Sequence, residues 1–468
     1  MTIWSDTDIA DMTTVPGRLR HLSPNLVRAM TQGWSAPPLA ECEWSGVGPR
    51  RTRRNLIAAD FPGETLVIPN GGLTTRTNDL PFPFRPATDH MWLVGPTGPG
   101  SVLIIGPNGD ETLYTPDHVQ LGHPLAVVDP HGALYEGPRP SLSELSARLG
   151  IATEPLDSLE ARLRETRSRA VRGLDPRVDA AVPDDDRELE KQLARRRLHK
   201  DEYEIAQLRQ TASATIEGFE AVARALPDAV RYGEQFIEGV FTRYARTFGR
   251  GIAFTPVVGS GPRATVPHWQ ANDHPIRSQD LLLLDAGVEG AELYSTDVAR
   301  TLPVSGRYSS AQRDVYDIVH AAHLAALDAT RAGKAFTAPH LAAQKVLLDG
   351  LASLGVLPHP VFDGFAEHER GWRWTLHTTS HMLGVDVHDG LPIAAEYFAG
   401  ILEEGHVLTV EPGLYFSPFD EYVPEHLRGI GVRIEDDVVV GDADIEILTA
   451  ALPTSSADVE TWLADLAE

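Results

Sequence analysis

The chain has one cysteine, Cys42, among its 468 residues. One thiol cannot form an internal disulfide, and no second cysteine or histidine stands beside it at zinc-site spacing. No stretch reaches the roughly 18 apolar residues that a transmembrane helix needs. The first eight residues have neither the basic start nor the apolar run of a secretory signal. We therefore expect a protein of the cytoplasm that does not cross a membrane.

Positive charge is also scarce, because 41 lysine and arginine residues face 66 aspartate and glutamate residues, a formal net charge of −25. Proteins that bind nucleic acid carry basic stripes, and this sequence shows none. No repeat recurs with a period of about 20 to 50 residues, which excludes solenoids and propellers. The hydrophobic share of 42% and the charged share of 23% fit a globular enzyme that is too long for one core.

Two regions of different pattern divide the chain near residue 190. Residues 1–190 contain short strand-like runs punctuated by Gly, Pro and Asn, which is typical of a smaller α/β domain. A dense charge run at 184–204 indicates a solvated helix or linker at the boundary. In residues 191–468, strand-like segments near 281–304 and 406–440 alternate with segments of helical spacing. This order predicts an α+β domain with helices packed on an antiparallel sheet.

Asp285 ends the apolar run Leu281-Leu-Leu-Leu, which predicts a buried strand. A buried carboxylate needs a partner because its desolvation is costly. A hairpin turn centred near Ala291 would set Asp297 directly opposite Asp285. Facing side chains of an antiparallel pair lie about 5 Å apart, so the two carboxylates must share a proton or bind cations. The alternative is a pair of surface aspartates near a turn, but the flanking Leu and Val residues favour burial.

A second acidic pair stands downstream. Glu411 ends the apolar run 407–410, and Glu435 follows Gly431-Val-Arg433-Ile in a similar pattern. Because side chains alternate along a strand, Arg433 and Glu435 point to the same face, where Arg433 can orient a neighbouring carboxylate. Taken alone, Arg433 and Glu435 are more typical of a solvated strand face than of a site.

Three histidines, His377, His381 and His388, stand between the two acidic pairs. The spacing of His377 and His381 would suit a helical zinc site, but the Thr-Thr-Ser between them disfavours a helix. We therefore expect a loop that enters a strand. A single histidine here would usually be structural, whereas histidines and carboxylates in this joint pattern indicate a site.

Four carboxylates and one imidazole make up the predicted ligand set. Their charge of −4 is neutralised by two divalent cations. Oxygen-rich ligands with one nitrogen favour Mn²⁺, with Co²⁺ or Zn²⁺ as substitutes, and the lack of cysteine excludes the soft-metal alternatives. Two such ions about 3.5 to 4 Å apart make hydroxide at neutral pH and polarise a carbonyl, which predicts hydrolysis of an amide or ester. The four carboxylates are those of Asp285, Asp297, Glu411 and Glu435, and one of the three histidines supplies the imidazole.

At these residues the sequence resembles the aminopeptidase P and prolidase branch of the M24 metallopeptidases, whose catalytic domain has the pita-bread fold. The resemblance covers about residues 200–455, and segment 78–95 upstream is similar to the creatinase-like N-terminal domain of aminopeptidase P. The motifs that carry it are Leu284-Asp285-Ala-Gly, Ser295-Thr-Asp297-Val-Ala-Arg-Thr, Ser380-His381-Met-Leu-Gly-Val-Asp-Val-His388-Asp, Thr409-Val-Glu411-Pro-Gly-Leu-Tyr415 and Gly431-Val-Arg433-Ile-Glu435-Asp.

The resemblance implies a role for each ligand. Asp285 and Asp297 would bind one metal, while His381 and Glu435 help to bind the other. Asp297, Glu411 and Glu435 would bridge the two ions. Glu411 would also be the base that takes the proton of the attacking water.

Five further side chains receive roles from the resemblance. His388 and His268 would stabilise the tetrahedral intermediate and assist the leaving nitrogen. His377 would flank the proline pocket, and Tyr415 and Arg433 would support the site from behind the ligands. The family usually has glycine where Thr378 stands, so this sequence departs from the family in the loop around His377.

The resemblance further implies an Xaa-Pro aminopeptidase, with peptides that have proline at position 2 as substrates and a homo-oligomer, dimer or tetramer, as the assembly. An Xaa-Pro bond is a tertiary amide without an N–H, so its cleavage calls for a dedicated pocket. Prolidase, which cuts only Xaa-Pro dipeptides, is the nearest alternative. Methionine aminopeptidases usually lack so long an N-terminal domain, and creatinase-like enzymes lack the metals. A distant alternative is an inactive pita-bread module that binds peptides or proteins.

Overall fold

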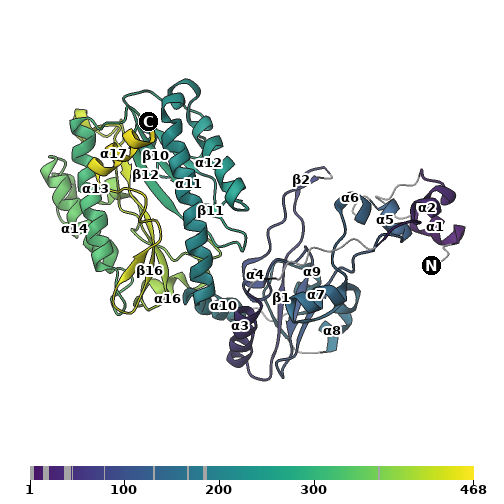
Figure 1. The fold of residues 1–468 in the computed structure, drawn as a ribbon. Helices are drawn as coiled ribbons and strands as arrows, with labels where there is room; N and C mark the ends of the chain where they lie inside the picture. Colours follow the sequence, from purple (N-terminus) through teal and green to yellow (C-terminus); the bar gives the residue numbers. More distant parts are fainter. Residues whose placement is uncertain are drawn as a thin grey trace. The chain divides into compact units, whose positions relative to one another are not determined.

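A computed structural model gives the fold of the chain. The chain forms two compact units, Met1–Gln192 and Leu193–Glu468 (Figure 1). The predicted boundary after residue 190 falls inside helix α10 (Glu188–Leu198). Cys42 and residues 183–186 of the charge run lie outside the described residues. The structure describes residues 5–13, 21–35, 44, 46–78, 80–129, 132–165, 168–182, 187–366 and 369–467.

The first unit contains a mixed sheet of short strands in the order β6-β5-β4-β1-β7. Strand β1 (Thr65–Pro69) pairs antiparallel with β4 (Val102–Ile105) and parallel with β7 (Ser168–Ala170), and every residue of β1 is buried. Burial on both faces explains why β1 and β4 read as continuous apolar runs. The other elements are α1 (Asp6–Thr13), α2 (Pro24–Met30), α3 (Val47–Asp60), β2 (Thr75–Thr77), β3 (Leu80–Pro81), α4 (Thr88–Leu93), β5 (Glu111–Thr115), α5 (Pro124–Val128), α6 (Ala133–Glu136), α7 (Leu142–Leu149), β6 (Ala152–Pro155), α8 (Leu159–Glu165) and α9 (Pro176–Ala181).

The second unit begins with long helices that have well-formed N-termini. The longest, α11 (Glu202–Tyr232), starts with a capping box between Asp201 and Glu204, which satisfies backbone N–H groups of the first turn. In Figure 1 the helices of this unit lie around its strands. The remaining helices are α12 (Glu234–Phe248), α13 (Ser310–Ala329), α14 (Ala338–Ser353), α15 (Trp372–Thr375), α16 (Ala394–Phe398) and α17 (Ser456–Ala467).

The strands of the second unit pair antiparallel, which confirms the predicted α+β class of this half. The mixed sheet of the first unit, with its helices, agrees with the predicted smaller α/β domain. Two three-stranded sheets have the orders β12-β10-β9 and β13-β16-β17, and they approach each other where Ala299 bridges Glu435. The strands are β8 (Gly251–Ile252), β9 (Val257–Ser260), β10 (Leu281–Ala286), β11 (Val288–Glu289), β12 (Val298–Pro303), β13 (Val407–Val410), β14 (Gly413–Tyr415), β15 (Gly431–Arg433), β16 (Asp436–Val440) and β17 (Ile445–Ile447). Within the part of the chain that the structure describes, no helix combines the length and apolar character that crossing a bilayer requires.

The predicted register of the β10–β12 hairpin is wrong by two residues. Asp285 pairs with Ala299 and not with Asp297. The turn is centred one residue later than expected, because Glu289 bridges Ser295 and the N–H of Gly290 bonds the carbonyl of Tyr294. Side chains alternate with a period of two, so a shift of two residues changes the partner and keeps the face. Both aspartates therefore still reach the same side of the hairpin.

Candidate metal centre

The two aspartates of the first acidic pair lie on neighbouring strands. Asp285 is in β10 and Asp297 directly precedes β12, and both side chains are buried. The Oδ1 atom of each is buried without a hydrogen-bond partner among the described residues. Burial and the charge of Asp285 raise the pKa of Asp297 well above its usual value. Buried carboxylate oxygens that lack donors and repel each other fit a bound cation.

One histidine and the second acidic pair complete this group. Nε2 of His381 lies 3.5 Å from Oδ2 of Asp297 and 3.6 Å from Oε1 of Glu411. Nδ1 of the same ring lies 3.2 Å from the carbonyl of Met382, which keeps the proton on Nδ1 and leaves Nε2 as the ligand atom. Asp297, His381 and Glu435 each offer one ligand atom within 4.8 Å of the others.

The two glutamates carry strongly perturbed carboxyl groups. Burial is the main cause that raises the pKa of Glu411 to about 7; His381 and Arg433 oppose this shift, and the charges of Asp297 and Asp285 add to it. Burial and the charge of Asp297 also raise the pKa of Glu435 well above its usual value, and Oε2 of Glu435 has no hydrogen-bond partner among the described residues. Carboxylates and one imidazole in so negative a cluster are a donor set for divalent cations.

A hydrogen-bonded chain leads from Asp285 to His377. Arg433, which is buried, donates to Oδ2 of Asp285 and, at 2.7 Å, to the hydroxyl of Tyr415. That hydroxyl lies 2.7 Å from Nε2 of His377. Burial and the charge of Arg433 lower the pKa of His377 to about 3, so its ring is neutral at neutral pH. Because Nδ1 of His377 faces the carbonyl of Thr378, Nε2 accepts the proton of the Tyr415 hydroxyl.

The other two predicted histidines lie near the hydrogen-bonded series of Arg433, Tyr415 and His377. The ring of His388 is 4.4 Å from the ring of His381, centroid to centroid, at an angle of 84°. Burial, together with the charges of His381 and His268, lowers the pKa of His388 to about 4. His268 is exposed, and its charge also lowers the pKa of His377. The structure thus brings all ten sequence-predicted side chains into one region.

Thr378 stands where glycine is expected, and its backbone is not in the left-handed region that would demand glycine. The next residue anchors the loop, because Oγ1 of Thr379 lies 3.1 Å from Nδ1 of His340 on α14. The carbonyl of Thr379 also accepts the backbone N–H of Glu411 at 2.8 Å. The loop that carries His377 and His381 is therefore fixed to a helix and to β13.

Asp437 is a buried residue behind the ligands that the sequence reasoning missed. Its carboxylate accepts the backbone N–H of Asp297 at 3.1 Å. Burial and the charge of Asp297 raise the pKa of Asp437 well above its usual value. A signal was present, because Asp437 follows Glu435 by two residues and so shares its face of the strand.

Arg300 is the second missed residue, and it donates every N–H of its guanidinium to groups behind the site. It donates to the carbonyl of Glu435 at 2.6 Å and to the carboxylate of Asp436 at 2.7 Å. It also donates to the carbonyls of Leu452 at 3.1 Å and Pro453 at 2.9 Å. In the sequence Arg300 looks like a solvated strand residue, since its partners follow more than 130 residues later.

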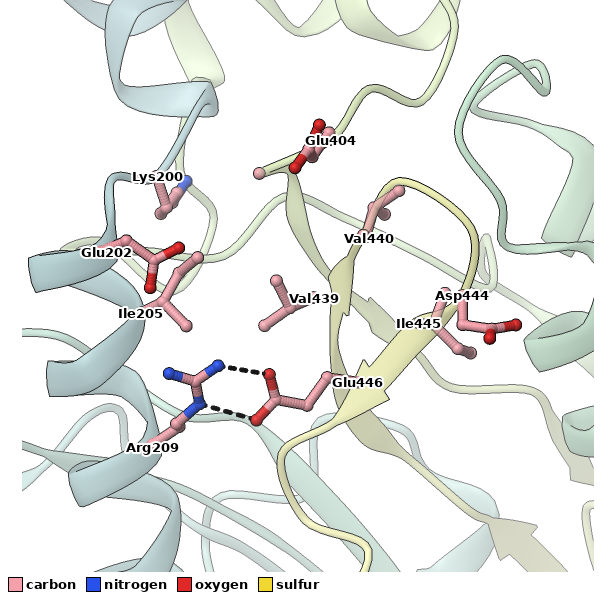
Figure 2. Close-up of a pocket in the computed structure, with 12 residues that line it drawn as sticks. Lys200, Glu202, Ile205, Arg209, Glu404, Val439, Val440, Asp444, Ile445 and Glu446 are labelled. Atoms are coloured by element: carbon pink, nitrogen blue, oxygen red, sulfur yellow. Dashed lines mark hydrogen bonds and ion pairs between the residues drawn. The ribbon is translucent and has the colours of Figure 1, made fainter.

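A separate cavity of about 500 Å³ opens beside α11 and β17 and contains none of the ten predicted side chains. Figure 2 shows its lining, in which Arg209 of α11 and Glu446 of β17 point toward each other. Their two hydrogen bonds are both 2.7 Å long. Two basic residues, Arg209 and Lys200, line the cavity. Nζ of Lys200 donates a hydrogen bond to the carboxylate of Asp389 at 3.2 Å. Both of these basic groups are already paired, so the cavity does not compete with the carboxylate cluster as a catalytic centre.

Comparisons with known proteins match both halves of the chain. The model of metallopeptidase family M24 matches residues 206–442, and the model of the aminopeptidase P N-terminal domain matches residues 50–172. Xaa-Pro aminopeptidase 1 of Streptomyces coelicolor is 41% identical over 457 residues, which cover 95% of this chain and 93% of the relative. The Xaa-Pro aminopeptidase of Escherichia coli is 29% identical over 442 residues, 88% of this chain and 97% of the relative.

Solved structures show the same likeness over nearly the full length. An aminopeptidase of Pseudomonas aeruginosa superposes with a TM-score of 0.80 at 26% identity and covers 91% of this chain and 99% of its own. Aminopeptidase P of Escherichia coli with the inhibitor Pro-Leu also superposes with a TM-score of 0.80, at 27% identity and the same coverage.

Proposed function

This chain belongs to metallopeptidase family M24, and from that premise we propose that it is an Xaa-Pro aminopeptidase, which releases the first residue of peptides that have proline at position 2. It is a hydrolase of the aminopeptidase class. The observation that carries the proposal is the buried cluster in which Asp297, His381 and Glu435 offer ligand atoms within 4.8 Å of one another. The resemblance to Xaa-Pro aminopeptidases over 95% of the chain supports the proline preference.

Asp285, Asp297, His381, Glu411 and Glu435 would hold two divalent ions. The ligand set has a charge of −4 and one imidazole, which favours Mn²⁺ over softer ions, with Co²⁺ or Zn²⁺ as substitutes. When bound, such ions polarise the peptide carbonyl and lower the pKa of water. The donor-free oxygens of Asp285, Asp297 and Glu435 support this assignment.

Glu411 is the residue that takes the proton of the attacking water. Its carboxyl lies inside the ligand group, with Oε1 3.6 Å from Nε2 of His381, where it can accept a proton from water at the site. Nδ1 of His377 lies 3.4 Å from Oε2 of Glu411, so the two side chains hold each other in place. The same carboxyl then returns the proton toward the leaving proline nitrogen, which has no hydrogen of its own.

His268 and His388 would donate hydrogen bonds to the tetrahedral intermediate and the leaving nitrogen. His377 flanks the proline ring. Tyr415 and Arg433 hold His377 and Asp285 through the hydrogen-bonded chain between them. The resemblance also supports a catalytic domain at 191–468, an N-terminal domain at 1–190, a cytoplasmic location, and a homo-oligomer of two or four chains.

Peptide hydrolysis by the full chain with added Mn²⁺ tests the proposal. We expect release of the first residue from an Xaa-Pro-Xaa tripeptide and loss of this activity in excess chelator. Hydrolysis of Xaa-Pro dipeptides without tripeptide cleavage would make the enzyme a prolidase. A purified chain with neither metal nor chelator-sensitive activity would instead be an inactive peptide-binding module.

A further inference from the structure

The loop that carries His268 is held by a buried carboxylate outside the metal centre. Glu234 is the first residue of α12, and its side chain is fully buried. Oε1 of Glu234 accepts from the backbone N–H of Ser260 at 2.8 Å and from the Ser260 hydroxyl at 2.7 Å. Oε2 accepts from Nε1 of Trp269 at 2.9 Å and from the backbone N–H of His274 at 3.0 Å. One carboxylate thus joins the end of β9 to both sides of the following loop.

His268 itself has little to fix its ring. The residue is exposed and makes no hydrogen bond to the residues that the structure describes. Its neighbours are fixed instead, since the carbonyl of Pro267 accepts from Nη2 of Arg433 at 3.3 Å and the indole of Trp269 donates to Glu234. The position of His268 is therefore set by the residue before it and the residue after it.

Trp269 also touches the wall of the site. Its ring packs against a small buried cluster that includes Leu283 and Tyr415, and the guanidinium of Arg263 lies 5.0 Å from the ring centroid. Rotation of the indole would therefore disturb Tyr415 and the backbone at His268 together. Only the Nε1–H of Trp269 fixes the ring by a directional bond, because its remaining contacts are apolar or lie over the ring face.

We propose that Glu234 is a positioning residue of the enzyme, which holds the His268 imidazole over the metal centre through its hydrogen bond to Trp269. The inference rests on the proposed function, because His268 matters only if a peptide bond is cleaved beside it. Burial of a carboxylate is costly, and four donors that converge on Glu234 offset this cost where the loop must keep one conformation. A displacement of about 1 Å at a group that contacts the reacting bond can lower turnover by about 100-fold. Loss of the hydrogen bond between Trp269 and Glu234 should therefore lower turnover measurably.

Two single variants separate positioning from stability. Trp269→Phe removes the Nε1–H and keeps a smaller aromatic ring at this position, while Ser260→Ala removes one hydroxyl donor from the other oxygen of the same carboxylate. We expect both to lower the melting temperature of the metal-loaded chain by similar amounts. Trp269→Phe should lower kcat/KM on an Xaa-Pro-Xaa tripeptide about 10-fold with unchanged metal content, whereas Ser260→Ala should stay within about 2-fold. Equal effects of the two variants on kcat/KM would overturn the proposal.

A double-mutant cycle with His268 asks whether the effect passes through that residue. In a His268→Ala background, Trp269→Phe should lower kcat/KM by clearly less than 10-fold, because only its effect through Tyr415 is left. A full additional 10-fold loss would contradict the inference, even with active wild-type enzyme. Glu234→Gln should behave like Trp269→Phe.

A measurement without turnover keeps the inference separate from the proposed function. The ring resonances of His268, assigned by their absence in His268→Ala, should shift in the NMR spectrum of Glu234→Gln, which keeps the indole beside His268, and stay unchanged in Ser260→Ala. Unshifted resonances in both variants would refute the positioning role. A wild-type chain that fails to cleave Xaa-Pro peptides but shows these shifts would refute the proposed function and leave the link between Glu234 and His268 in place.

Discussion

At the scale of single residues, Asp297 is the side chain on which the interactions of the metal centre converge. His381 lies 3.5 Å from its carboxylate, and Asp437 binds its backbone N–H at 3.1 Å. Its pKa is raised first by burial and then by the charge of Asp285, and a bound cation would offset both effects. The buried carboxylate of Asp297 therefore destabilises the fold without metal and stabilises it when metal is bound.

We expect Asp297→Asn to lose bound metal and about 100-fold or more of kcat/KM on an Xaa-Pro peptide, because a neutral amide cannot balance the ions. In excess chelator the same variant should melt at or above the wild-type temperature, since one repelling charge is gone. Metal analysis, kinetics and thermal melting check these three effects. A variant that keeps full metal content and rate would contradict the role of Asp297.

His388 should behave differently, because the resemblance assigns it to the reacting peptide bond and not to the metals, although its ring lies 4.4 Å from the ring of the ligand His381. We expect His388→Ala to lower kcat about 100-fold, the range of a lost general acid or oxyanion donor, while metal content stays at the wild-type level. Metal analysis and steady-state kinetics on one preparation check this. Loss of metal in His388→Ala would place His388 among the ligands.

The side chains of the candidate site could be predicted from the sequence because they follow apolar strands and match family motifs. Arg300 and Glu234 could not, for a physical reason. Each is a charged residue whose burial depends on partners far along the chain, such as Ser260 and Trp269 for Glu234. In the sequence such residues look like solvated ones.

At the scale of elements, the sequence predicted the strands and helices of the second unit better than their register. The β10–β12 hairpin was placed two residues out of register, because the backbone of the turn decides its centre and Leu293 there has an unexpected φ of 64°. The face of each aspartate was still predicted correctly, since it depends only on alternation along the strand.

The close approach at Gly287, between β10 and β11, gives a test of this packing. A Cβ atom at Gly287 would lie 1.7 Å from the carbonyl oxygen of Thr296. We therefore expect Gly287→Ala to lower the free energy of unfolding by about 3 kcal/mol. Gly239, inside α12 with nothing within 4 Å of the added atom, is the matched control, and Gly239→Ala should stabilise by about 0.5 to 1 kcal/mol. Urea unfolding of both variants checks the contrast, and equal effects would contradict it.

The ion pairs that Asp389 makes near the junction of α10 and α11 predict that the fold is less stable in acid. Asp389 is buried between Arg197 Nε at 3.0 Å and Lys200 Nζ at 3.2 Å. Burial alone would raise the pKa of Asp389, but Lys200 and Arg197 outweigh it and hold the pKa below its usual value. A depressed folded pKa gives stability that is present above about pH 4 and is lost as the pH falls through the folded value.

Asp389→Asn leaves two buried cations without their carboxylate, and we expect it to cost about 3 to 5 kcal/mol at pH 7. The difference from wild type should shrink below about pH 4, as the wild-type carboxyl itself becomes protonated. Unfolding by urea at a series of pH values from 7 to 3 measures this. A difference that stays constant over the whole range would show that Asp389 stabilises without its charge.

At the scale of the whole molecule, each unit has its own buried core, with Val67 and Ile104 in the first and Phe219 and Phe241 in the second. All five proposed ligands lie in the second unit. Calorimetry of the full chain should therefore resolve two transitions, of which only one moves up with Mn²⁺. At about 100 times the dissociation constant, the metal should stabilise the second unit by about 2.7 kcal/mol. A shift of both transitions would contradict independent units.

The division into an α/β and an α+β half follows from the order of strand-like and helix-like segments, so the sequence was sufficient for it. The cytoplasmic location and the oligomeric state stay predictions, because location depends on sorting and assembly depends on surfaces between chains. Neither follows from the pairing of strands within one chain.

Arg300 gives the metal centre a dependence on distant sequence. Its guanidinium holds the backbone of the last ligand, Glu435, and at the same time the carbonyls of Leu452 and Pro453. If the segment before α17 became disordered, the Arg300 guanidinium would lose the carbonyls of Leu452 and Pro453 as acceptors. The backbone at Glu435 would then be held less firmly. A substitution near the end of the chain can thus weaken metal affinity while it leaves every ligand untouched.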